Sequence, residues 1–280
     1  MKRTLSLMLV AMMAFTLSMT SLAATDNGIL LGVDNASGLS LSNGLLKPGE
    51  SYRFPVEASI DGVTQTLTDA LLETHSFRIS NTGKGKTVTG MKLAEIGGIY
   101  YVTAEVKAGW PAVQTEEEYA FKLVSKADGK TVSESKIGFY TGYGIADDAV
   151  IDALQNEDMI QINNNAPIFT KDQLARIARI NNYKKVSFSG SNWTYKANVT
   201  DMGDINMVHN INGISEILAK YEDNSFEFLT FPAGTKFASN GTMELDVSDL
   251  TGSFNESFFV YRYLDGKLTL IPSQLDAENE

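Results

Sequence analysis

The chain has 280 residues, no cysteine and a formal net charge of −11 at pH 7. The absence of cysteine excludes disulfides, thiolate metal sites and attachment through a lipidated cysteine. The acidic excess disfavours binding to nucleic acid or to anionic lipid surfaces, because both carry negative charge. A hydrophobic content of 43%, with 14 Phe and 11 Tyr, is sufficient for packed domains.

The N-terminus has the pattern of a secretory signal peptide. Lys2 and Arg3 precede an apolar run at 5–17, and small residues stand at Ser21 and Ala23, which predicts cleavage after Ala23. The run is shorter than the roughly 20 residues that span a bilayer, so we expect no membrane insertion after signal cleavage. Removing the two basic residues leaves 21 basic against 34 acidic residues, a net charge of −13. We therefore expect a secreted, extracellular bacterial protein, from a Gram-positive cell and associated with the cell surface.

Residues 24–144 are expected to form the first domain. Short runs of alternating apolar residues are separated by turn signals such as Asn43-Gly44 and Asp128-Gly129, the pattern of a two-sheet, Ig-like β-sandwich. Pro55 within one run predicts an edge strand or a bulge, because proline lacks the backbone N–H. Residues 68–72 are compatible with either a short helix or a loop.

The remaining segments are expected to be a connector at 145–168 with a short acidic helix, a second domain at 169–272 and an acidic tail at 273–280. In the second domain, Thr170 and Gln173 form a capping box, which predicts a helix that begins one residue after Thr170.

Strands are expected on both sides of the turn at 190–192, and Trp193 on the second of them is interpreted as a core residue. A second short helix is predicted near 214–221, and Asp265-Gly266 predicts the turn of a closing hairpin. The predicted fold class is mainly β, with two tandem β-sandwich (Ig-like) domains, the second carrying one or two short helices.

Four segments of the last 110 residues or so carry a resemblance to a group of known domains. They are Phe169–Leu174, Val186–Phe188, Trp193–Tyr195 and Val260–Leu268. Together they resemble Ig-like or related β-sandwich modules of large secreted and cell-surface proteins of Gram-positive anaerobes. The resemblance implies a spacer, adhesion or binding role. The sequence shows no dockerin-like calcium loop and no sorting tail, so the resemblance does not imply a means of attachment to a cell wall or scaffold. Such modules often have a further closing strand, and a sheet that lacks it has an open edge able to accept a partner's strand.

The sequence offers few groups for catalysis or metal binding. His75 and His209 are far apart and lack the spacing of a helical zinc pair. The run Gly83–Thr87 lacks a glycine that a phosphate loop requires and is interpreted as a solvated turn. Two acidic clusters suit calcium chemically, but solvated acidic faces are the favoured interpretation; they are Asp147, Asp148 and Asp152, and Asp201 and Asp204. We therefore predict no catalytic residue, no metal and no cofactor.

Aromatic residues are the remaining candidates for a binding site. Trp110 lies in an expected loop, where a large apolar ring often has a binding role, and Tyr140 and Tyr143, which follow the expected strand that ends near Phe139, are candidates to join it. Exposed Trp and Tyr rings can form a platform for a sugar or an anchor in a protein interface. Tyr100 or Tyr101 is a further candidate for this platform.

The leading hypothesis is a secreted, non-catalytic surface, adhesion or assembly module whose partner is a cell-surface protein or an extracellular glycan. The first alternative is a carbohydrate-binding module that uses Trp110 and neighbouring tyrosines. The second is a glycoside hydrolase whose two carboxylates no sequence pattern reveals.

Overall fold

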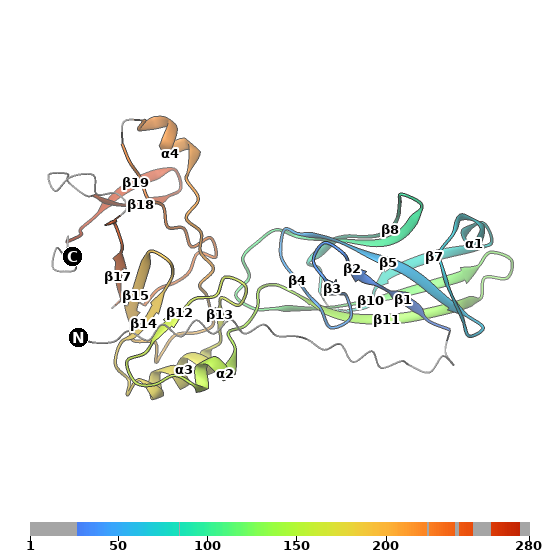
Figure 1. Ribbon diagram of the computed structural model, residues 1–280, viewed down its shortest axis with the longest axis horizontal. Coiled ribbons are helices and arrows are strands. Elements are labelled where there is room, and N and C mark those ends of the chain that lie inside the picture. Colours follow the sequence, from blue (N-terminus) through green and yellow to red (C-terminus); the bar gives the residue numbers. More distant parts are fainter. Residues whose placement is uncertain (1–26, 84, 223, 239–240, 249–258, 275–280) are drawn as a thin grey trace.

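The computed structural model describes residues 27–83, 85–222, 224–238, 241–248 and 259–274. The predicted signal peptide and most of the acidic tail lie outside the described residues. The described chain is mainly β, as predicted. It forms two bodies that lie end to end, each with its own hydrophobic core (Figure 1).

The first domain is a sandwich of two sheets. One sheet has the order β1-β5-β9-β8 with β6 also paired to β5, and the other has the order β4-β11-β10-β7. The strands are β1 (Ile29–Leu31), β2 (Val33–Asp34), β3 (Leu39–Ser40), β4 (Leu45–Leu46), β5 (Ser51–Ile60), β6 (Val63–Thr66), β7 (His75–Asn81), β8 (Val88–Ile96), β9 (Ile99–Val106), β10 (Thr115–Ser125) and β11 (Thr131–Thr141). Helix α1 (Asp69–Thr74) occupies the segment that the sequence left undecided, with Thr68 as its N-cap.

The core of this domain follows from the alternation along the strands. Phe54 of β5 and Phe121 of β10 have no exposed surface, and Phe139 of β11 is 1% exposed. Successive side chains of a strand point to opposite faces, so these rings meet between the two sheets while their neighbours in the sequence face outward.

The prediction for Pro55 is wrong, because β5 lies in the middle of its sheet. Residues Ser51–Pro55 pair with β9, and Val56–Ala58 pair with β1 on the other side. Pro55 therefore stands where the pairing partner changes, and its carbonyl still accepts a hydrogen bond from the Gly32 N–H at 2.8 Å. A proline is tolerated at this position because no ladder bond requires its missing N–H.

The backbone around Gly85 and Thr87, in the segment that the sequence analysis interpreted as a solvated turn, is held by a buried carboxylate. Glu117 has no exposed surface, and its Oε1 accepts hydrogen bonds from the Thr87 N–H at 2.7 Å and hydroxyl at 2.6 Å. The Asn81 amide donates to the other oxygen at 3.2 Å. A Cβ at Gly85 would lie 2.4 Å from Glu117 Cδ, so the glycine is required by close packing.

The second domain is built on a four-stranded sheet with the order β12-β14-β15-β17. Its strands are β12 (Met159–Gln161), β14 (Val186–Ser189), β15 (Trp193–Ala197) and β17 (Thr242–Leu245), and the two-stranded pieces are β13 (Ile168–Phe169) with β16 (Ile205–Asn206) and β18 (Val260–Leu264) with β19 (Lys267–Ile271). The helices are α2 (Asp148–Asp152), α3 (Lys171–Ile180) and α4 (Ser215–Lys220). Strands β12 and β14 are parallel, and α3 lies in the connection between them, as a parallel pair requires.

Helix α3 begins at Lys171, and both hydrogen bonds of the predicted capping box are present. The Gln173 N–H donates to the Thr170 hydroxyl at 3.2 Å, and the Thr170 N–H donates to the Gln173 side chain at 3.0 Å. Leu174 and Ile177 face a core that also contains Trp193, which is 3% exposed. The core role predicted for Trp193 is confirmed.

The two domains are joined by direct contacts. Tyr143, Ile168 and Val208 form a small buried cluster. The Asn206 side-chain amide donates to the carbonyl of Pro111 at 2.9 Å, and Lys47 Nζ donates to Asn165 Oδ1 at 2.8 Å. Asn206 is 3% exposed, so a hydrogen bond from a buried side chain ties the loop after β9 to the second domain.

Candidate functional site

The predicted aromatic platform of Trp110, Tyr140 and Tyr143 is only partly assembled. The rings of Trp110 and Tyr143 are stacked, with centroids 5.8 Å apart and planes at 16°. Trp110 is 45% exposed, but Tyr143 is only 8% exposed, because it packs against Ile168 and Val208 of the second domain. Tyr143 is therefore a buried junction residue, and the expectation that it offers an exposed face is wrong.

Tyr140 is 41% exposed and makes no ring contact within the described part of the chain. Tyr100 lies at the start of β9, whereas Trp110 follows the end of that strand. Its hydroxyl donates to Asp69 of α1, and this hydrogen bond raises the pKa of Tyr100 to about 12. Tyr100 and its neighbour Tyr101 are thus at the opposite end of β9 from Trp110.

The histidines and the first acidic cluster have structural partners. His75 Nδ1 lies 2.9 Å from the Thr74 hydroxyl, and the ring of His209 packs edge-on against Trp193, with centroids 5.1 Å apart. Arg176 Nη2 lies 2.9 Å from Asp148 and 3.1 Å from Asp152. The Arg176 guanidinium therefore lies between these two carboxylates, in the place that a bound metal ion would take. Among the described residues, no group of three or more His, Cys, Asp or Glu side chains is arranged for a metal ion.

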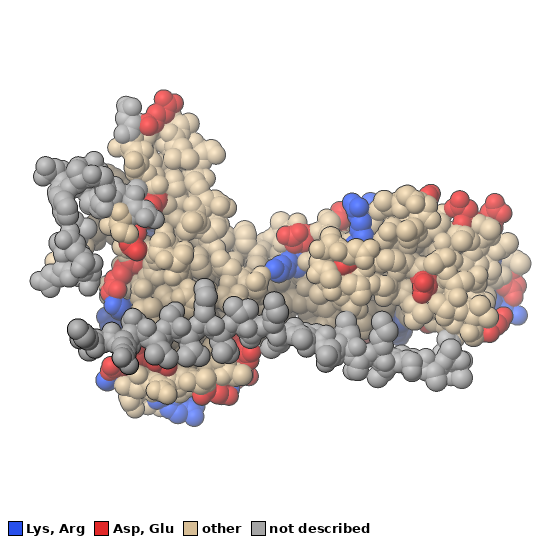
Figure 2. All heavy atoms as spheres, in the orientation of Figure 1, with Lys and Arg blue, Asp and Glu red and all other residues tan. Residues whose placement is uncertain are grey.

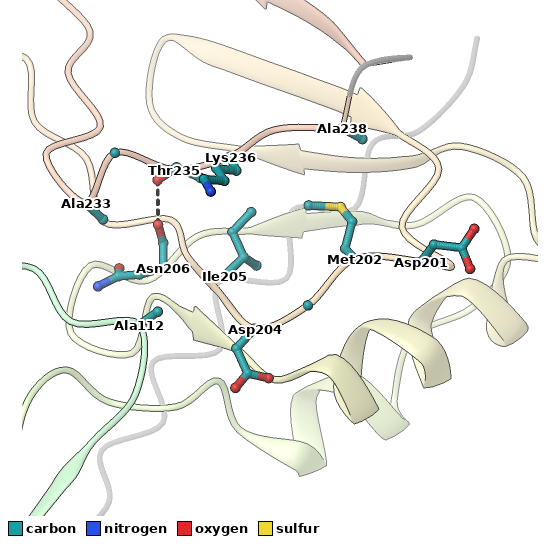
Figure 3. Close-up of a pocket in the computed structure, with 12 residues that line it drawn as sticks. Ala112, Asp201, Met202, Asp204, Ile205, Asn206, Ala233, Thr235, Lys236 and Ala238 are labelled. Atoms are coloured by element: carbon teal, nitrogen blue, oxygen red, sulfur yellow. Dashed lines mark hydrogen bonds between the residues drawn. The ribbon is translucent and has the colours of Figure 1, made fainter.

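A cavity of about 470 Å³ lies at the junction of the two domains (Figure 3). Segment 201–206 forms one wall, segment 233–238 forms the other, and Ala112 of the first domain lies at one end. The Thr235 hydroxyl donates to the Asn206 carbonyl at 2.6 Å and ties the two walls together. The volume is within the range of small-ligand sites, roughly 300 to 1,000 Å³.

The two carboxylates that line this cavity do not converge on it. Asp204 Oδ1 accepts a hydrogen bond from the Lys171 N–H at the start of α3, at 2.7 Å. Figure 3 shows the carboxylate of Asp201 pointing away from the other lining side chains. A hydrolytic pair requires two carboxylates that face one bond, and this arrangement does not supply them.

Among the described residues of the second domain, an exposed apolar surface lies on the hairpin β18–β19. Its register places five apolar side chains on one face: Phe259, Tyr261, Tyr263, Leu268 and Leu270. We call this face the hairpin surface. Near the turn, the Tyr263 hydroxyl donates to Glu216 of α4 at 2.8 Å. At the other end Phe259, Tyr261 and Leu270 are 63%, 49% and 54% exposed.

Strand β17 is a second uncovered feature. It is the last strand of its sheet, so one side of its backbone has no neighbouring strand in the described structure. Met243 and Leu245 stand opposite Tyr195 and Trp193 in the register, on the face that elsewhere carries the core, yet they are 36% and 37% exposed. The resemblance implied an open sheet edge only if a closing strand is missing, and it did not place such an edge on this strand.

The junction cavity and the exposure of the hairpin surface were missed from the sequence. The alternation Phe259, Tyr261, Tyr263 was visible, but alternation indicates only which side chains share a face and not whether that face is covered. No local pattern marks the cavity, because its walls come from segments about 30 residues apart and from the other domain.

Comparison with known proteins gives no family assignment. No protein-family model matches the sequence, and no curated protein matches it. Among solved structures, a similarity is found to the crystal structure of the titin M3 domain, with 12% identity and a TM-score of 0.22, covering 42% of this chain and 97% of that chain. No described helix is both long enough and apolar enough to cross a membrane.

Proposed function

We propose that the protein is an exported, non-catalytic adhesion or assembly module that binds a protein partner through the hairpin surface. The observation that supports this proposal is the exposure of Phe259, Tyr261 and Leu270 on one face of β18–β19. Aromatic residues are enriched at the energetic centres of protein interfaces, and contiguous exposed apolar area on a soluble protein marks interaction sites.

The open edge of β17 supports the same function. An extended strand of a partner gains main-chain hydrogen bonds when it pairs with such an edge, and its alternating side chains can cover Met243 and Leu245. On the face seen in Figure 2, a broad area of the second domain carries neither sign of charge.

The binding test compares two double variants of the mature protein on cells of the organism that encodes it. Y261S/L270S removes two apolar side chains from the hairpin surface. The matched control Y140S/L30S removes the same residue types from exposed positions of the first domain, where Tyr140 and Leu30 are 41% and 47% exposed. We expect Y261S/L270S to weaken cell binding at least tenfold, since interface hot spots contribute about 2 kcal/mol or more, and the control to bind as the wild type does.

Treating the cells with protease or with periodate separates the two kinds of partner. Loss of binding after protease treatment agrees with a protein partner, whereas loss only after periodate indicates a glycan and contradicts the proposal. Equal binding of the two double variants also contradicts it. Export is tested by mass spectrometry of the protein from culture medium, where we expect Ala24 as the first residue.

Carbohydrate binding is a second candidate function, and the stacked pair of Trp110 and Tyr143 favours it. Of the two stacked rings, only that of Trp110 has an exposed face, so we expect the site to bind a single sugar ring. Saturable binding to an insoluble polysaccharide that is lost in W110A and retained in Y140A supports this function over the leading one.

A further inference from the structure

The junction cavity combines an apolar lining with a lysine, Lys236, that has no partner among the described residues. Its apolar side chains come from both walls and from the first domain; they are Ala112, Met202, Ile205, Ala233 and Ala238. Ile205 is 5% exposed, so the floor of the cavity belongs to the core of the second domain. The cavity therefore offers an apolar floor of the kind that binds a short hydrocarbon group.

Lys236 is the charged group placed to face this space. In Figure 3 its ammonium lies on the cavity side of segment 233–238, above Ile205. It forms no salt bridge or hydrogen bond with any described residue. The nearby carboxylates do not neutralise the charge of Lys236. Asp204 accepts a hydrogen bond from the Lys171 N–H at the start of α3, and Asp201 points away.

The two segments that form the walls also contain backbone N–H groups without a described partner. In the described part of the chain, the N–H groups of Gly203, Thr235 and Lys236 have no hydrogen-bond partner. Backbone N–H groups are strong donors that need an acceptor. A ligand with oxygen acceptors at one end and an apolar stem at the other matches the Lys236 ammonium and the apolar floor.

We infer that the junction cavity binds a carboxylate on a short apolar stem, with Lys236 as the group that pairs with the carboxylate. The ligand class is an apolar carboxylic acid, either free or as the end of a peptide. This site is separate from the hairpin surface and does not depend on the proposed function. Because Ala112 belongs to the first domain, the site is complete only when the two domains are docked.

The test measures hexanoate binding to the mature full-length protein by ligand-observed NMR, with 1-hexanol and hexylammonium as probes of the same stem. We expect hexanoate to bind more tightly than the other two. K236M keeps most of the apolar stem of the lysine and removes its charge. It is expected to weaken hexanoate about three- to fivefold, the usual effect of a partly exposed charge pair, and to leave hexanol unchanged.

Two further variants locate the site. K92M removes an exposed lysine from β8 of the first domain and is expected to leave hexanoate binding unchanged. A112F fills one end of the cavity and is expected to weaken hexanoate and hexanol alike, with thermal unfolding recorded to show that the variant folds. The inference is overturned if hexanoate fails to bind, or if hexylammonium or hexanol binds as tightly as hexanoate does. It is also overturned if K92M weakens hexanoate binding as much as K236M does, or if a folded A112F binds hexanoate as the wild type does. Y261S/L270S should bind hexanoate as the wild type does, so the failure of one proposal does not imply the failure of the other.

Discussion

At the scale of single residues, Asp34 shows how the fold uses a buried carboxylate. Asp34 is 4% exposed. Its Oδ1 accepts hydrogen bonds from the N–H groups of Ala36 at 2.7 Å and Ser37 at 3.1 Å, and its Oδ2 accepts one from the Arg53 N–H at 2.8 Å. Burial alone raises the pKa of Asp34, but these backbone donors outweigh burial and hold the pKa below its ordinary value of 3.8.

The pKa of Asp34 makes stability depend on pH. A carboxyl whose pKa is lower in the folded state stabilises that state fully above the unfolded pKa, and the contribution is lost as the pH falls through the folded pKa. We expect D34N to lower the free energy of unfolding by about 1 to 3 kcal/mol near neutral pH. The loss should shrink as the pH falls from 3.8, near which the carboxyl of the unfolded chain takes up a proton, through the lower pKa of the folded state.

Urea unfolding at neutral and at acid pH measures this difference. D61N is the matched control, since Asp61 is an exposed residue in the turn between β5 and β6. An equal loss of stability in D34N at both pH values contradicts the assignment of a charged, hydrogen-bonded carboxylate.

At the scale of elements, helix α3 is fixed at its start by local hydrogen bonds. We expect T170A to lower the free energy of unfolding by about 1 kcal/mol, because the N–H of Gln173 loses its acceptor. T170S keeps a hydroxyl at the same place and should retain most of the stability. Chemical denaturation of the three proteins measures the effect, and a T170A midpoint equal to that of the wild type means that the cap contributes nothing.

The strands show where local signals suffice and where they do not. The hairpin β18–β19 forms as predicted, because Asp265 and Gly266 adopt positive φ angles of 50° and 75° that suit a two-residue turn. Strand β12 was not predicted, since three residues are too few for a visible alternation. The prediction for Pro55 was wrong because the strands that pair with β5, β1 and β9, are distant from it in the sequence, and a local pattern does not reveal them.

At the scale of the whole molecule, the junction couples the two domains. Y143A removes the ring that packs on Ile168 and Val208 and supports Trp110. We expect it to cost about 2 to 4 kcal/mol of the stabilisation that holds the domains together. Calorimetry should then show two separate unfolding transitions in Y143A, and small-angle X-ray scattering should show a wider range of molecular dimensions.

The matched control for the junction is Y140A, which deletes the same ring three residues earlier, at an exposed position. It should leave the number of transitions and the scattering curve unchanged. If Y143A behaves as Y140A does, the domains are held by polar contacts such as the bond from Asn206 to the Pro111 carbonyl.

The sequence by itself determined the mainly β class, the start of α3 and the turn of the last hairpin. These features depend on interactions between residues a few positions apart, such as Thr170 with Gln173, and neighbouring residues can be read directly. Only the tertiary structure decided that Tyr143 is buried while Trp110 keeps an exposed face. It also decided that no described residue covers one face of the closing hairpin, and that a cavity lies between the domains. Each of these depends on which distant segments pack together, and a periodic pattern specifies the face of a strand but not the surface that covers it.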